Sequence, residues 1–213
     1  MNSSLTLCSR FLVRVVIALM LLVNARAAPP QTILVFGDSL SAGYGLAAGE
    51  DWPSLISKQL PKSWQLVNAS QSGETTDGGL TRLPALLARH TPAIVVIELG
   101  ANDGLRGNDL ELAQHNLSEM IRASQNAGAK VLLVSMQLPP NFGKRYTSRF
   151  ADMYVQLAKQ YTLPPPPFLF EGVADKPNLF QPDQLHPRKE AQPQLASTIW
   201  RTLGSMLNRK KPS

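Results

Sequence analysis

Three residue types in this chain could together carry out acyl transfer: a serine, a histidine and an aspartate. Ser39 follows Gly37 at the end of an apolar run, so little side chain shields its hydroxyl. His186 is one of three histidines and has Asp183 three residues earlier in a polar turn. An aspartate at this spacing can accept the Nδ1 proton of the histidine, which leaves Nε2 free to accept the serine proton. The three residues therefore predict a nucleophile, a base and an orienting group.

Acyl transfer also needs donors for the oxyanion that forms on the carbonyl oxygen. Gly73 can bring a backbone N–H close to a substrate, and Asn102 can point its side-chain amide to the same place. Each cluster alone has a plainer explanation, as a capped strand-to-helix turn, a helix-start hydrogen bond or a simple turn. The coincidence of four polar clusters in this order is what favours catalysis.

Other chemistries lack their residues in this sequence. No two histidines have metal-ligand spacing, so we expect no metal site, and His90 and His115 are interpreted as structural. The chain has neither the Gly-x-Ser-x-Gly elbow of α/β-hydrolases nor a glycine-rich phosphate loop, and we expect no cofactor. Cys8 is the only cysteine, and it lies in a segment that we expect to be removed.

The elements that must position these residues are short apolar runs alternating with helical patterns. Continuous apolar runs are typical of strands buried on both faces of a parallel sheet. The predicted strands are 32–36, 65–69, 94–99, 131–135 and 168–170, the last preceded by four prolines. The predicted helices are 52–60, 79–90, 110–127, 146–161 and about 189–208. We therefore expect a single doubly wound α/β domain, with the polar clusters beyond the carboxyl ends of the strands.

The first 27 residues have the pattern of a secretory signal peptide. Two arginines precede an apolar run over 15–23, and Ala25-Arg26-Ala27 supplies the small residues of a cleavage site. The run is shorter than the roughly 20 residues that cross a bilayer, so we expect cleavage near Ala27 and no stable membrane anchor. A buried N-terminal helix is the alternative, and it would require an amphipathic period that is not visible. The mature domain would then span 28–213.

The charge excludes a nucleic-acid partner. The net charge of +6 falls to +3 without residues 1–27, because that segment holds three arginines and no acid. The remaining charges are mixed, apart from a short basic tail at 209–211, and make no electrostatic stripe. We expect the mature protein to be a monomer.

The four polar clusters resemble the sequence blocks that define the SGNH (GDSL) hydrolases. The matching residues are 37–41, Gly73, 100–103 and 183–187. Further segments are similar to a branch of bacterial periplasmic acyl-CoA thioesterases that are also described as arylesterases and lysophospholipases. These segments are 67–70, 81–87, 96–100, 102–107 and 137–141.

The resemblance implies a flavodoxin-like, three-layer α/β/α sandwich with five parallel strands. It implies Ser39 as nucleophile, His186 as base and Asp183 as its partner. The oxyanion hole would consist of the Ser39 and Gly73 backbone N–H groups and the Asn102 side chain. The implied substrates are small acyl esters and thioesters, including lysophospholipids, and the implied location is the periplasm or the medium.

One departure from the family pattern is Ala101, which stands where a second glycine is usual. If this residue had a positive φ, alanine would strain the loop.

An acyl group also needs an apolar groove, and two segments are predicted to border it. The first is a loop of Thr75, Thr76, Asp77, Gly78, Gly79 and Leu80, with a hinge at its two glycines that would let it close over an acyl chain. The second is a loop over Asn141–Arg149, which begins with Asn141 and Phe142. Two other functions stay open: a carbohydrate O-acetylesterase on the same scaffold, and a non-catalytic module whose groove carries lipid.

Overall fold

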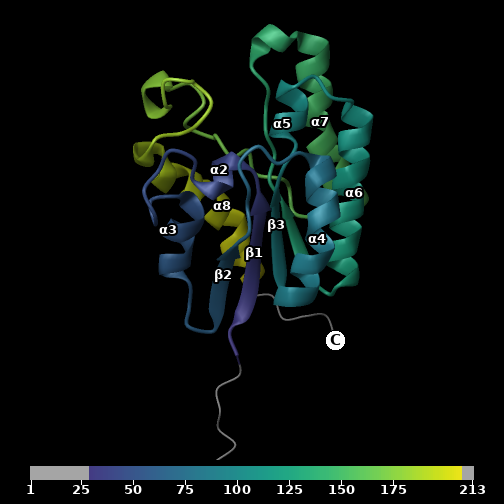
Figure 1. Ribbon diagram of the computed structural model, residues 1–213, viewed down its shortest axis with the longest axis vertical. Helices are drawn as coiled ribbons and strands as arrows, with labels where there is room; N and C mark the ends of the chain where they lie inside the picture. Colours follow the sequence, from purple (N-terminus) through teal and green to yellow (C-terminus); the bar gives the residue numbers. More distant parts are fainter. Residues whose placement is uncertain (1–28, 208–213) are drawn as a thin grey trace, which may run out of the picture. The chain divides into compact units, whose positions relative to one another are not determined.

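The computed structural model describes residues 29–207 of the chain. The predicted signal peptide, its cleavage site and the basic tail at 209–211 lie outside the described residues. Figure 1 shows a central sheet with helices on both sides, so the predicted α/β sandwich is confirmed. Among residues 29–207, no helix is long and apolar enough to cross a membrane.

The sheet has four parallel strands in the order β2-β1-β3-β4. Their bounds are β1 Gln31–Gly37, β2 Trp64–Asn68, β3 Ile94–Glu98 and β4 Lys130–Leu133. Every residue of the central strand β3 is buried, as are the last six of β1, whereas the edge strand β2 is half-exposed. This burial explains the continuous apolar runs, and the strand order is that of flavodoxin-like folds.

The predicted fifth strand is wrong. Residues 168–170 contribute an isolated parallel bridge between Ser135 and Phe168, with two hydrogen bonds: Ser135 N–H to the Pro167 carbonyl (2.9 Å) and Leu169 N–H to the Ser135 carbonyl (3.2 Å). The preceding residues 164–167 are all prolines, which have no N–H to donate to a ladder. Within the described part of the chain the sheet therefore has four strands.

The predicted helices are confirmed, with shifted ends. On one side of the sheet α3 packs against α8, and on the other α4 and α7 pack against α6 (Figure 1). Their bounds are α3 Trp52–Gln59, α4 Thr76–His90, α6 Leu110–Asn126, α7 Lys144–Gln160 and α8 Gln192–Leu207. A 3-10 turn, η3 Lys189–Ala191, precedes α8. Two further 3-10 turns are η1 Pro140–Phe142 and η2 Pro177–Leu179.

Two short helices that the sequence pattern did not predict begin at the candidate site. They are α2 Ser39–Ala42, directly after β1, and α5 Ala101–Leu105, directly after β3. Because β1 and β3 are neighbours and parallel, both helices start at the same edge of the sheet.

Candidate active site

Ser39 is the first residue of α2, at the carboxyl end of β1. The preceding residue, Asp38, caps this helix by accepting a hydrogen bond from the Leu40 N–H to Oδ1 (2.9 Å). The strand thus ends and the helix begins within two residues, which presents the Ser39 hydroxyl at the sheet edge.

The structure brings Ser39, His186 and Asp183 into a hydrogen-bonded chain. The Ser39 Oγ lies 2.9 Å from His186 Nε2, and His186 Nδ1 lies 2.7 Å from Asp183 Oδ2. Both distances are within hydrogen-bond range. The serine and the histidine are 147 positions apart in sequence, so only the fold joins them.

The Asp183 carboxylate is held in its charged form. Its Oδ1 accepts the backbone N–H groups of Leu185 (2.9 Å) and His186 (3.0 Å). Burial raises the pKa of Asp183, but these hydrogen bonds and the His186 side chain outweigh it and lower the pKa to about 2. An ionised carboxylate at this distance favours the imidazole tautomer that carries its proton on Nδ1, and in that tautomer Nε2 can accept a proton from Ser39.

Tyr44 lies against the imidazole of His186, and no sequence pattern predicts it as a site residue. The two ring centroids are 4.5 Å apart at an interplanar angle of 40°. Its backbone carbonyl accepts a hydrogen bond from Gln181 Nε2 (2.8 Å). Nothing in the spacing of Tyr44 signals this contact, because it depends on the distant turn that carries His186.

The Asn102 side chain, on α5, faces the same region and is fully engaged. Its Nδ2 donates to the Glu74 carbonyl (2.9 Å) and to Asp38 Oδ2 (3.1 Å), and a side-chain amide has two N–H groups. Within residues 29–207, the backbone N–H groups of Ser39 and Gly73 donate to no protein acceptor. Two of the three expected oxyanion donors are therefore available as they stand, and the third is tied to its neighbours.

The segment after Gly73 is anchored from α5. The Gly73 carbonyl accepts a hydrogen bond from Arg106 (3.2 Å). The buried Asp103 accepts two hydrogen bonds from Thr76, one from its backbone N–H (2.9 Å) and one from its hydroxyl (2.8 Å). Helix α5 thus supplies Asn102 and also positions the backbone of Gly73.

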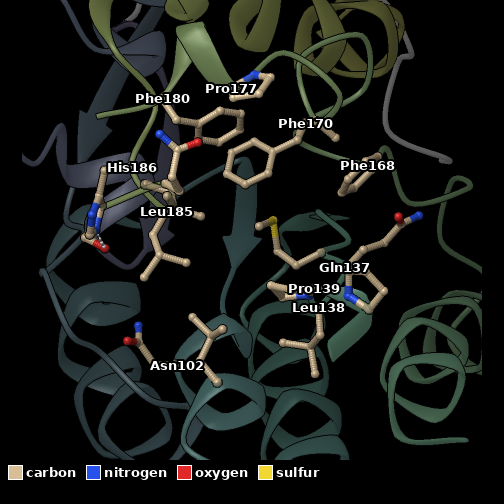
Figure 2. Close-up of a pocket in the computed structure, with 17 residues that line it drawn as sticks. Asn102, Gln137, Leu138, Pro139, Phe168, Phe170, Pro177, Phe180, Leu185 and His186 are labelled. Carbon is tan, nitrogen blue, oxygen red and sulfur yellow. Dashed lines mark hydrogen bonds between the residues drawn. The ribbon is translucent and has the colours of Figure 1, made fainter. Parts of the chain in front are cut away.

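A mostly apolar cavity of about 410 Å³ opens at the candidate triad. Figure 2 shows His186 and Asn102 on one side of it and Phe168 on the other. Leucine, methionine, proline and phenylalanine side chains make up most of the wall; they include Leu40, Leu105, Met136, Leu138, Phe170 and Phe180. The volume and lining are typical of a site for an apolar small-molecule group.

The comparison with known proteins identifies the family. Residues 35–192 match the GDSL-like Lipase/Acylhydrolase family. The chain belongs to this family.

Similar proteins cover nearly the whole of this GDSL-like hydrolase. Esterase TesA of Pseudomonas aeruginosa is 47% identical over 194 residues, which are 90% of this chain and 96% of that protein. Thioesterase 1/protease 1/lysophospholipase L1 of Escherichia coli is 41% identical over 189 residues, 89% of this chain and 91% of that protein. The crystal structure of esterase EstA from Pseudoalteromonas, inhibited by monoethylphosphonate, has a TM-score of 0.79 and 40% identity; the match covers 84% of this chain and all of that one (100%).

The loop predicted from Thr75 to Leu80 is wrong for this hydrolase. Thr75 caps α4 by accepting the Gly78 N–H (3.4 Å), and Thr76 to Leu80 form the first turns of that helix. Gly79 packs so closely that a Cβ there would lie 2.7 Å from Leu99 Cδ1. The expected hinge therefore lies inside a helix, and none of the six residues lines the cavity.

The second predicted segment is displaced by about two residues. Pro139 and Pro140 line the main cavity, but Asn141 does not, and Phe142 lines a separate shallow groove beside Tyr146. The sequence signal for the main wall is the apolar run at 168–170, which its pattern predicts to be a strand.

Ala101 causes no strain in this hydrolase. The positive φ, 111°, falls on Gly100, while Ala101 begins α5 with a helical backbone. A Cβ on Gly100 would also lie 2.6 Å from the Tyr154 hydroxyl, which donates to the Leu99 carbonyl. Glycine is therefore needed at the first position of this pair and not at the second.

Across the described residues, no group of three or more histidine, cysteine, aspartate or glutamate side chains is arranged to hold a metal ion.

Proposed function

We propose that this hydrolase cleaves carboxylic esters and thioesters of small acyl substrates through an acyl-enzyme on Ser39. The observation that carries the proposal is the contact of the Ser39 Oγ with His186 Nε2 (2.9 Å) at the mouth of the apolar cavity. The names of its relatives, esterase and thioesterase/lysophospholipase, support the same reaction class.

The reaction proceeds in two steps. The Ser39 Oγ attacks the carbonyl carbon while His186 Nε2 accepts its proton. The C–O or C–S bond then breaks, and His186 returns the proton to the leaving alcohol or thiol. Water attacks the acyl-enzyme by the reverse sequence, with His186 again as base, and releases the carboxylic acid. Asp183 remains ionised throughout and stabilises the imidazolium.

The oxyanion is stabilised by the backbone N–H groups of Ser39 and Gly73 and by the Asn102 amide. For Asn102 to donate to the oxyanion, it must redirect one N–H away from Glu74 or Asp38. The redirected N–H binds the charged oxyanion more strongly than the neutral carbonyl of the bound substrate, which is the condition for raising kcat.

The acyl chain occupies the apolar cavity, where it meets phenylalanine and leucine side chains. Lysophospholipids fit this class because they present one acyl ester on a polar headgroup. The leader pattern over 1–27 supports export to the periplasm or the medium, and the proposed form is a monomer without a cofactor.

The test is labelling with an organophosphonate, which forms a covalent bond with an activated serine. The wild type is expected to bind one equivalent and lose esterase activity, and Ser39→Ala to bind none. Ser205→Ala, which removes an exposed hydroxyl on α8, is the matched control and should be labelled like the wild type. Labelling of Ser39→Ala would refute the nucleophile, and failure to label the wild type would favour the lipid-carrier module.

A chain-length series of nitrophenyl esters from acetyl to palmitoyl then distinguishes the acyl hydrolase from a carbohydrate O-acetylesterase. We expect kcat/KM to rise beyond acetyl because longer chains bury apolar surface in the cavity. Activity confined to acetyl would favour the acetylesterase.

A further inference from the structure

A buried carboxyl group lies beneath the turn that carries Ser39, and the mechanism above does not use it. Glu98 is the last residue of β3, and its exposed fraction is 0%. Its Oε2 accepts a hydrogen bond from the Ser41 hydroxyl at 2.6 Å, whereas Oε1 has no partner among the described residues. Burial of a carboxyl group with one oxygen unpartnered is costly, so a plain packing role would be served better by an apolar side chain.

Gly37, the last residue of β1, leaves the space that this hydrogen bond occupies. A Cβ on Gly37 would lie 2.7 Å from Glu98 Oε2 and 2.7 Å from the Ser41 Oγ. The φ of Gly37 is not positive, so the glycine is needed for space and not for its backbone conformation. Gly37, which lies two residues before the nucleophile, therefore packs directly against the Glu98–Ser41 pair.

Ser41 is also held from the other side. Its backbone carbonyl accepts a hydrogen bond from Asn68 Nδ2, at the end of β2, at 2.7 Å. Helix α2 has four residues, which is too short to be stable by its own hydrogen bonds. Its orientation therefore depends on contacts such as these two, which tie Ser41 to the strands on either side of β1.

We propose that Glu98 is a positioning residue that acts through Ser41: it holds α2 in the orientation that aims the Ser39 Oγ at His186. The proposal rests on the role of Ser39 proposed above. Ser39 and Ser41 belong to the same helical turn, so a rotation of α2 that is allowed by the loss of this bond would move the nucleophile relative to a histidine held on a different segment.

The protonation of Glu98 guides the choice of variants. Burial raises the pKa of Glu98 well above its usual value, and the charge of Asp38 raises it further, although the hydrogen bond from Ser41 opposes both. The neutral acid is thus favoured. Glutamine has the same shape and no charge, so Glu98→Gln is the conservative variant, and Glu98→Leu removes the polar group while it fills the space.

The decisive variant is Ser41→Ala, which removes one hydroxyl. We expect kcat for a nitrophenyl ester to fall by about 10- to 100-fold, the effect of misplacing a reacting group by about an ångström, with KM changed by about twofold or less. Glu98→Leu should likewise lower kcat and leave KM nearly unchanged. The double variant should have a kcat no lower than that of the slower single variant, because the two residues act through one bond. Glu98→Gln should retain most of the wild-type kcat.

Ser124→Ala is the matched control. Ser124 is also a fully buried serine, but its hydroxyl bonds the Met120 carbonyl of its own helix, α6, away from the site. It should leave kcat unchanged. Thermal unfolding of every variant is measured in parallel, and if Glu98→Leu does not fold, Ser41→Ala decides alone.

Phosphonate labelling separates this proposal from the one on which it rests. Ser41→Ala should be labelled to one equivalent on Ser39, but about 10- to 100-fold more slowly than the wild type. If the wild type is labelled and Ser41→Ala is labelled at the same rate with a wild-type kcat, the positioning role is wrong and the nucleophile stands. A lowered melting temperature with unchanged kcat would likewise overturn it, and a wild type that is not labelled on Ser39 would overturn both.

Discussion

The two halves of the candidate site are built in opposite ways. The base half is a local turn in which Asp183 and His186 are three residues apart, with side chains 40% and 19% exposed. The nucleophile half rests on buried acids, Asp38 and Glu98, that connect α2 to the sheet and to α5. The base is therefore held by short-range bonds close to water, and the nucleophile by long-range bonds away from it.

The pKa values of the two aspartates follow this difference. Hydrogen bonds from backbone N–H groups and from His186 overcome burial and lower the pKa of Asp183 to about 2. Burial raises the pKa of Asp38 to about 6, although it too accepts hydrogen bonds, from Leu40 and Asn102. An aspartate side chain thus stays ionised in the base half, whereas in the nucleophile half an aspartate is protonated more readily.

The largest expected decrease in kcat comes from removing the base. His186→Ala should lower kcat by on the order of 10⁶-fold, because without it nothing accepts the Ser39 proton, and adding Ser39→Ala should cost little more. Steady-state ester hydrolysis measures both. His115→Ala, on the outer face of α6, is the control and should keep wild-type activity. Additive losses in the double variant would mean that the two residues do not act as a unit.

The next largest effect on kcat tests whether the exposed turn needs the charge of Asp183. Asp183→Asn should lower kcat by about 10³- to 10⁴-fold, because an amide favours the wrong imidazole tautomer. The turn should persist, since the asparagine oxygen can still accept the N–H groups of Leu185 and His186. A loss below about tenfold would show that solvent replaces the carboxylate.

A smaller loss of kcat is expected from the nucleophile half, where Asn102 bonds to Asp38. Asn102→Ala should reduce kcat by about 10²- to 10³-fold, since it removes one oxyanion donor, and should change KM little. Ester hydrolysis by Asn102→Ala at the wild-type rate would remove this residue from the mechanism.

The smallest expected effect is on the free energy of unfolding, whose pH dependence distinguishes the two aspartates. Asp38 has a folded pKa of about 6 against an ordinary value of 3.8, so between these values the folded protein binds more protons than the unfolded one. Its contribution to the free energy of unfolding is present below pH 3.8 and declines as pH rises toward 6, by up to about 3 kcal/mol. Urea unfolding at several pH values should show this decline in the wild type and a flatter profile in Asp38→Asn.

Asp183 should act with the opposite sign in a different range. Its folded pKa of about 2 lies below the ordinary 3.8, so its contribution is present above pH 3.8 and is lost as pH falls toward 2. Asp183→Asn should flatten the profile below pH 4 and leave the slope between 4 and 6 unchanged. Matching changes in both variants would contradict the separation of the two halves.

Sequence patterns located the strands and long helices because burial in a two-sided sheet and along helix faces leaves a local periodic signal. They placed the helix over 79–90 three residues late, since the capping role of Thr75 is compatible with a loop as well as with a helix start. They predicted a strand at 168–170 that does not form, because apolar residues there line the cavity instead of pairing with a neighbouring strand. The short helices α2 and α5 are too brief to leave a period.

The sequence by itself determined which residues can do the chemistry, because a nucleophile, a base, an acid and small donors are properties of residue type and close spacing. It also determined the layered α/β fold, through the alternation of apolar runs. Only the tertiary structure decided that Ser39 meets His186, that Asn102 is tied to Asp38 and Glu74, and that Glu98 lies under Ser41. These contacts join residues between 28 and 147 positions apart, and geometry at that range is set by how the elements pack and not by any local pattern.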